Sequence, residues 1–109
     1  MVDPRRLIDA VDGPAALNFL AKMISFKSYS GEPGEADLAR FMVNAMKTVG
    51  LEAELSPVPE ERFNAIGTLK GTGNGKSLLF NGHMDTNPVT GDWTVDPWGD
   101  RKTSCRERV

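Results

Sequence analysis

The sequence has little of the features that mark several specialised classes of protein. Its 109 residues include one cysteine and one histidine, and 13 basic residues stand against 15 acidic ones, for a net charge of −2. This balance gives no electrostatic reason to expect nucleic acid or an anionic membrane as a partner. No apolar run approaches the roughly 20 residues that a membrane-spanning helix requires. Because Cys105 is the only cysteine, an intramolecular disulfide is excluded, and we expect a reducing, cytoplasmic location.

The length and the ordinary composition, 39% hydrophobic and 26% charged, fit one small globular domain that begins with two helices. Residues 12–14, Asp-Gly-Pro, are typical of a helix start, and apolar residues then recur at helical spacing as far as Ile24. A second helix is predicted from about residue 35 to residue 49, with Gly50 at its end. Its apolar stripe consists of Leu38, Phe41, Met42, Ala45 and Met46.

Strand patterns follow the two helices. Residues 51–58 alternate between apolar and polar side chains, which predicts a half-buried strand that Pro57 and Pro59 end. A second strand is predicted at residues 63–69. Residues 77–81 are short and mostly apolar, which is typical of a strand buried on both faces. The order of helices and strands predicts an α/β fold whose sheet is incomplete at the end of the chain.

His83 and Asp85 are the candidate functional residues. They follow directly after the predicted strand at 77–81, and in open α/β sheets binding sites gather at the carboxyl ends of strands. The imidazole of His83 is a natural zinc ligand. Asp85 lies on the same side of an extended chain and could accept the other ring N–H, as a metal-ligating histidine requires. A purely structural role for the pair stays open, because a zinc site needs at least three protein ligands and spacing does not support Asp96 as another.

Two motifs resemble one family of zinc hydrolases. Residues 78–89, Leu-Leu-Phe-Asn-Gly-His-Met-Asp-Thr-Asn-Pro-Val, are similar to its pattern of an apolar strand followed by Gly-His-x-Asp-Thr-x-Pro. Residues 93–99 are similar to its Trp-x-x-Asp-Pro-aromatic-Gly motif and stand at the right spacing. The family contains acetylornithine deacetylase, succinyl-diaminopimelate desuccinylase, aminoacylase and related zinc exopeptidases. The resemblance covers most of residues 14–99.

The resemblance implies that the chain is the N-terminal part of a three-layer catalytic domain of the zinc-exopeptidase kind. It implies two zinc ions, which Co²⁺ can replace, and hydrolysis of amide or peptide bonds in N-acylated amino acids or small peptides. His83 would ligate one metal, and Asp85 would act in catalysis by holding that imidazole. The metals would activate a bridging water, with a glutamate as the general base. Members of the family are often homodimers.

The resemblance also implies that this chain alone is inactive, because the aspartate that bridges the metals, the adjacent glutamates and a further histidine cannot be placed in it. Residues 1–99 are then part of a catalytic domain, whereas residues 100–109 are charged, aperiodic and unlike the family. Translated in a shifted frame, these last codons are compatible with Gln-Lys-Asp-Glu-Leu-x-Gly-x-Gly, which restores the family's Asp-x-Leu-x-Gly-x-Gly. A frameshifted tail is our hypothesis, and a genuinely divergent terminus is the alternative.

Two other interpretations compete with an enzyme. The first is an inactive product or an interaction fragment, which fits the missing ligands but leaves the intact His-x-Asp motif unexplained. The second is nucleotide binding through residues 71–77, whose Gly-Lys-Ser end is similar to a phosphate loop. Lys70 stands where that loop requires glycine, and residues 78–80 have the pattern of a strand instead of the helix that would hold the anion. A hairpin turn is the simpler interpretation of the glycine-rich segment.

Overall fold

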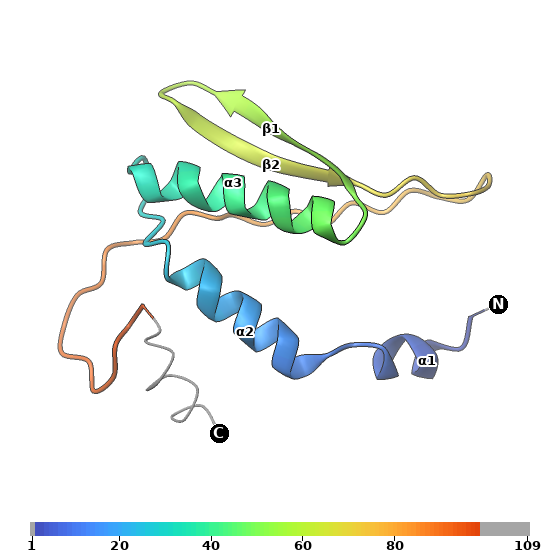
Figure 1. The fold of residues 1–109 in the computed structure, drawn as a ribbon, viewed down its shortest axis with the longest axis horizontal. Coiled ribbons are helices and arrows are strands. Elements are labelled where there is room, and N and C mark those ends of the chain that lie inside the picture. Colours follow the sequence, from blue (N-terminus) through green and yellow to red (C-terminus); the bar gives the residue numbers. More distant parts are fainter. Residues whose placement is uncertain (1, 99–109) are drawn as a thin grey trace. The chain divides into compact units, whose positions relative to one another are not determined.

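The computed structural model describes residues 2–98, which form three helices and two strands (Figure 1). The described residues divide into two compact units, one made of residues 2–25 with 92–98 and the other of Phe26–Gly91. No helix among the described residues has both the length and the apolar character that crossing a membrane takes. The hypothesis of a frameshifted tail at 100–109 concerns residues outside the described part.

The first unit carries two short helices, α1 (Pro4–Asp9) and α2 (Gly13–Ile24). The predicted start of α2 is confirmed. Oδ1 of Asp12 accepts a hydrogen bond of 3.0 Å from the backbone N–H of Ala15, and Pro14 occupies the first turn, where its missing N–H is harmless. The sequence did not predict α1, because its six residues are too few to show helical periodicity.

The second unit is built from helix α3 (Pro33–Thr48) and the hairpin of β1 (Glu52–Val58) and β2 (Arg62–Thr68). The helix contacts both strands and runs along the hairpin (Figure 1). The sequence predicted all three elements, and no end differs from its predicted position by more than two residues.

The buried apolar side chains of the second unit lie on α3. Leu38 is 2% exposed, and Ala39 and Val43 are also buried. The other members of the predicted stripe are only half-buried: Phe41, Met42, Ala45 and Met46. The predicted stripe included neither Ala39 nor Val43, although both are buried. The small side chain of Ala39 lets the helix approach its neighbours closely.

Gly50 ends α3 as predicted. Its φ is 94°, a left-handed conformation in which a side chain would be strained. The N–H of Gly50 donates to the carbonyl of Lys47, and the N–H of Leu51 donates to the carbonyl of Met46, each at 3.0 Å. These two bonds form a Schellman motif, which satisfies the last carbonyls of the helix and turns the chain into β1.

The hairpin is antiparallel, with Leu55 opposite Ala65. The predicted alternation is confirmed in β1, where Leu55 is half-buried and Glu54 is exposed. The prediction that Pro57 ends the strand is wrong, because Pro57 lies inside β1, opposite Phe63. In a two-stranded sheet every strand is an edge strand, and a proline that lacks its N–H is tolerated at an edge.

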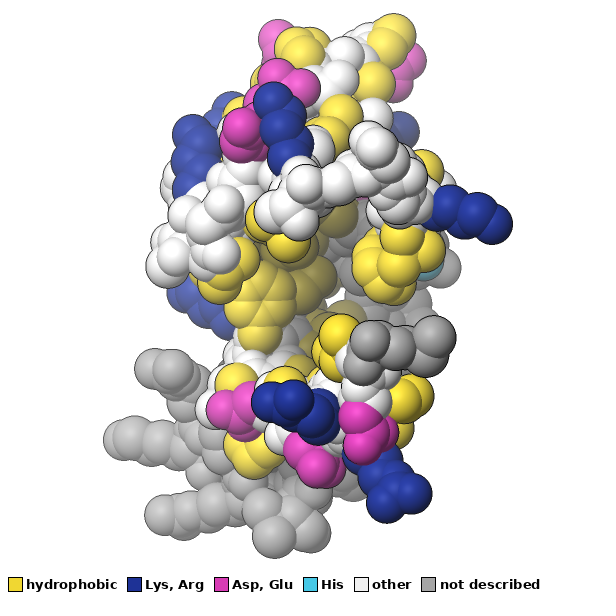
Figure 2. All heavy atoms as spheres, turned by 90° about the vertical axis from the view of Figure 1, so that its right-hand side faces the viewer, with side chains coloured by type: hydrophobic (Ala, Val, Ile, Leu, Met, Phe, Trp, Pro, Cys, Tyr) yellow, Lys and Arg dark blue, Asp and Glu magenta, His cyan; other side chains and the backbone are white. Residues whose placement is uncertain are grey.

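Residues 77–81 are not a strand, contrary to the prediction. Leu78, Leu79 and Phe80 are exposed, with Leu79 at 86%. A strand forms only where its backbone groups find partners, and within residues 2–98 the one sheet consists of β1 and β2. Figure 2 shows hydrophobic side chains uncovered on one face of the described residues. The α/β class is confirmed, in the form of helices with a two-stranded sheet.

Candidate functional site

The segment that carries the candidate site is held by a loop that precedes α3. Tyr29 and Thr86 form a parallel bridge. The N–H of Thr86 donates to the carbonyl of Ser28 at 2.8 Å, and the N–H of Ser30 donates to the carbonyl of Thr86 at 3.3 Å. The Oγ of Ser28 also donates to the carbonyl of Met84 at 2.7 Å. The backbone on both sides of Asp85 is therefore fixed by the loop at residues 28–30.

The structure brings His83 and Asp85 together. Nδ1 of His83 lies 2.9 Å from the backbone carbonyl oxygen of Asp85 and 3.2 Å from its carboxylate Oδ1. Because both neighbours are acceptors, this geometry favours the tautomer with the proton on Nδ1, which leaves the lone pair on Nε2. The His83 side chain is 85% exposed, so solvent and solutes can reach the ring.

The donor set on the described residues fits one metal ligand and its hydrogen-bonded partner. An imidazole that donates Nδ1–H to a carboxylate and presents Nε2 outward is the usual form of a zinc-ligating histidine. Within residues 2–98 no group of three or more His, Cys, Asp or Glu side chains gathers where it could hold a metal ion. The described residues can therefore supply one ligand, and a complete site would take others from elsewhere.

The Trp-x-x-Asp-Pro motif lies in the first unit, at residues 93–98 of the described part. Oδ1 of Asp96 accepts a hydrogen bond of 3.0 Å from the backbone N–H of Trp98. The carboxylate of Asp96 thus organises its own turn. Trp98 is half-buried and Trp93 is exposed.

The sequence did not reveal an ion pair between α3 and the start of β2. Nε and Nη2 of Arg62 donate to the two carboxylate oxygens of Glu35 at 2.7 and 2.8 Å, a bidentate arrangement. Glu35 is buried and lies in the same helical row as Ala39 and Val43. A carboxylate in an otherwise apolar row was the signal that a cation must lie opposite, although it does not identify Arg62.

The two side chains of this pair shift each other's pKa. The hydrogen bonds from Arg62 hold the pKa of Glu35 below its ordinary value of 4.5, against the burial that would raise it. The Glu35 carboxylate in turn raises the pKa of Arg62. The charge of Asp85 raises the pKa of both groups, so the candidate site lies within electrostatic range of the pair.

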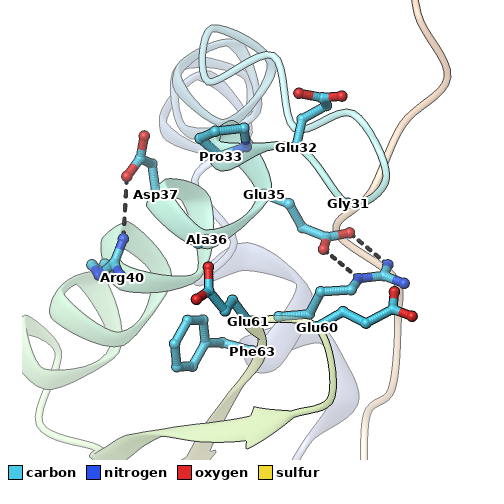
Figure 3. Close-up of a pocket in the computed structure, with 11 residues that line it drawn as sticks. Gly31, Glu32, Pro33, Glu35, Ala36, Asp37, Arg40, Glu60, Glu61 and Phe63 are labelled. Atoms are coloured by element: carbon cyan, nitrogen blue, oxygen red, sulfur yellow. Dashed lines mark hydrogen bonds and ion pairs between the residues drawn. The ribbon is translucent and has the colours of Figure 1, made fainter.

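An open cleft of about 470 Å³ lies between the N-terminal turn of α3 and the turn that joins β1 to β2 (Figure 3). Dashed lines in Figure 3 mark the contacts of Glu35 and, further along α3, the pair of Asp37 with Arg40 at 3.2 Å. Glu60 and Glu61 line the opposite wall. The lining carries both signs of charge, and the Glu35 pair ties the two walls together.

Comparison with known proteins gives two informative relatives. The chain is 37% identical over 93 residues to the acetylornithine deacetylase of Proteus mirabilis (strain HI4320), which covers 78% of this chain and 24% of that protein. It is 38% identical over 78 residues to the acetylornithine deacetylase of Photorhabdus laumondii subsp. laumondii, which covers 69% of this chain and 20% of that protein. No family model and no solved structure matches the chain.

These similarities place the chain in the amidohydrolase class. Within that class, it belongs to the family of acetylornithine deacetylase, and the resemblance seen in the sequence motifs is confirmed. The chain spans about a quarter or less of the length of these relatives.

Proposed function

We propose that the chain is part of a two-zinc hydrolase that cleaves amide or peptide bonds of N-acylated amino acids or small peptides. One observation carries the proposal: the chain is similar to acetylornithine deacetylases, and its His83 and Asp85 lie together as a metal-binding histidine and its carboxylate partner do. The names of the relatives favour a deacetylase that acts on a small acylated amino acid.

In this proposal each residue of the pair has one task. Nε2 of His83 ligates a metal, and Asp85 accepts the Nδ1–H, which orients the ring and raises its basicity. A bound zinc or cobalt ion would polarise the substrate carbonyl and lower the pKa of a bound water. In this proposal the remaining ligands and the general base would come from residues other than those described here, 2–98.

The alternative, an inactive or interaction fragment, agrees with the incomplete ligand set among residues 2–98. Under this alternative the chain has no hydrolase activity by itself, whereas the main proposal takes its activity from the relatives that it resembles. Nucleotide binding at residues 71–77 has less support. Residues 78–98, the described residues that follow this segment, contain no helix whose N-terminus could hold a phosphate.

Zinc titration of the chain tests the proposal. We expect one weak zinc site per chain, because a single imidazole with few neighbours binds metal poorly. His83→Ala removes the only imidazole and should abolish this binding. Asp85→Asn should weaken it by about 10- to 100-fold, the usual effect of losing the carboxylate behind a ligating histidine.

Asp96→Asn is the matched control, because it removes a carboxylate that organises a turn in the other unit. Its zinc affinity should equal that of the unmodified chain. Equal affinities for the chain, His83→Ala and Asp96→Asn, measured by calorimetry, would show that the motif does not bind metal here.

A further inference from the structure

A chain of polar contacts links α3 and β2 to the segment that carries His83 and Asp85. Arg62 is fixed by both carboxylate oxygens of Glu35, and its Nη2 lies 3.4 Å from Oγ of Ser30. Ser30 belongs to the loop at residues 28–30, which pairs with Thr86. We call Glu35, Arg62, Ser30 and Ser28 the polar brace.

Ser28 is the member of the polar brace that touches the motif directly. It is 3% exposed, and its hydroxyl donates to the carbonyl of Met84 at 2.7 Å. Met84 is the residue between His83 and Asp85, so this bond fixes the backbone from which both side chains project. Without the hydroxyl the Met84 carbonyl would lose a short hydrogen bond in a part-buried place, where an unmade bond is costly.

Arg62 acts on the same segment from one step further away. Its guanidinium reaches the loop at Ser30 and lies within electrostatic range of Asp85. Removing it would leave the buried carboxylate of Glu35 unpaired near the carboxylate of Asp85. The repulsion between these two carboxylates, which already raises the pKa of Glu35, would then lack the opposing charge of Arg62. A lysine would keep the charge but lose the bidentate grip on Glu35.

We propose that Ser28 and Arg62 are positioning residues that hold His83 against Asp85 in the orientation a metal requires. The hydroxyl of Ser28 sets the backbone, and Arg62 sets the loop through Ser30 while balancing Glu35. The purpose of holding the pair, which is metal binding by His83, rests on the proposed metal-dependent hydrolase. That the polar brace holds the pair is a statement about this chain alone, and it can be tested without metal.

The first readout is the tautomer of His83, measured from ring-nitrogen shifts in a long-range ¹H–¹⁵N correlation spectrum at about pH 8, where imidazole is neutral. The unmodified chain should show mainly the Nδ1–H form. Ser28→Ala and Arg62→Gln should shift the population toward the mixture of a free imidazole, and Arg62→Lys should lie between. Ser25→Ala is the matched control, because it removes a hydroxyl that bonds only the carbonyl of Lys22 in α2.

The second readout is hydrogen exchange of the Thr86 amide, which donates to the carbonyl of Ser28. Exchange should speed up by about tenfold in Ser28→Ala and in Arg62→Gln, whereas the paired amides of β1 and β2 keep their protection. If Ser28→Ala also loses protection in the hairpin, the variant has unfolded, and Arg62→Lys then decides the question.

An unchanged tautomer population and an unchanged Thr86 exchange rate in the variants that stay folded, as in Ser25→Ala, would overturn the inference. Loss of zinc binding in His83→Ala concerns the proposed function separately. The two tests can give different answers. If zinc binding does not depend on His83, but Ser28→Ala loses the tautomer preference of His83, the metal site is refuted and the role of the polar brace stands.

Discussion

At the scale of single residues, the carboxylate of Glu35 needs a cationic partner within the second unit. Its side chain is 7% exposed and shares a helical row with the buried Ala39 and Val43. A carboxylate there is tolerated because the bidentate guanidinium of Arg62 replaces the water it loses. The same contact makes stability depend on the protonation of Glu35.

The pKa of Glu35 lies below its ordinary value of 4.5 in the folded chain. The unfolded chain therefore takes up this proton at a higher pH than the folded chain does. The stabilisation from Glu35 is fully present above the unfolded pKa and is lost as the pH falls through the folded pKa. We expect Glu35→Gln to be less stable than the unmodified chain near neutral pH, with a difference that shrinks as the pH falls below 4.5.

Urea unfolding at neutral pH and at about pH 3.5 measures this difference. Asp37→Asn is the control, because Asp37 is an exposed carboxylate in the same turn of α3, paired with an exposed Arg40. Only for Glu35→Gln should the difference in unfolding free energy from the unmodified chain become smaller in acid. If the difference in unfolding free energy between Glu35→Gln and the unmodified chain stays constant over this pH range, the role of the ion pair is contradicted.

At the scale of elements, the sequence predicted what depends on neighbours in the chain. The helix start at residues 12–14, the end of α3 at Gly50 and the alternation in β1 are local signals, and all three are confirmed. The strand at residues 77–81 was wrong, because an apolar run becomes a strand only when another strand pairs with it. Whether a partner strand is present is a non-local property, and local composition does not predict it.

The contacts of the candidate site divide in the same way, into local contacts that the sequence predicts and non-local contacts that it does not. His83 and Asp85 are two residues apart, so their proximity could be read from the sequence. Ser28 contacts Met84 from 56 residues away, and Arg62 contacts Glu35 from 27 residues away. Neither contact has a local signature: Arg62 reaches Glu35 where α3 packs on the hairpin, and Ser28 reaches Met84 where the loop at 28–30 pairs with Thr86. The His83–Asp85 pair was therefore predictable, and the side chains that contact its segment were not.

Burial separates two leucines that the sequence treated alike as core. Leu38 of α3 is 2% exposed and Leu79 is 86% exposed. Leu38→Ala should lower the free energy of unfolding by about 2–5 kcal/mol, through lost burial and the cavity left behind. Leu79→Ala should change it by less than about 0.5 kcal/mol. Denaturant unfolding of both variants measures this, and similar losses would mean that residues 77–81 are packed.

At the scale of the whole molecule, the described residues combine a family motif with no cluster of side chains that could hold a metal ion. The chain belongs to the acetylornithine deacetylase family but spans about a quarter or less of its relatives. Within residues 2–98 no three potential ligands gather, and His83 is largely exposed to solvent. Catalysis by two metals needs both ions held in a dry, shaped site, which one exposed imidazole does not provide.

We therefore expect the chain with zinc to release no acetate from N-acetylornithine above the uncatalysed rate, even if zinc binds to His83. The reason is that binding one ion supplies neither the second metal nor the general base. An assay for the free amine in the product, with the chain and His83→Ala in parallel, measures this. Hydrolysis that requires zinc and disappears in His83→Ala would show that the chain assembles a working site by itself, through residues beyond the His83–Asp85 pair.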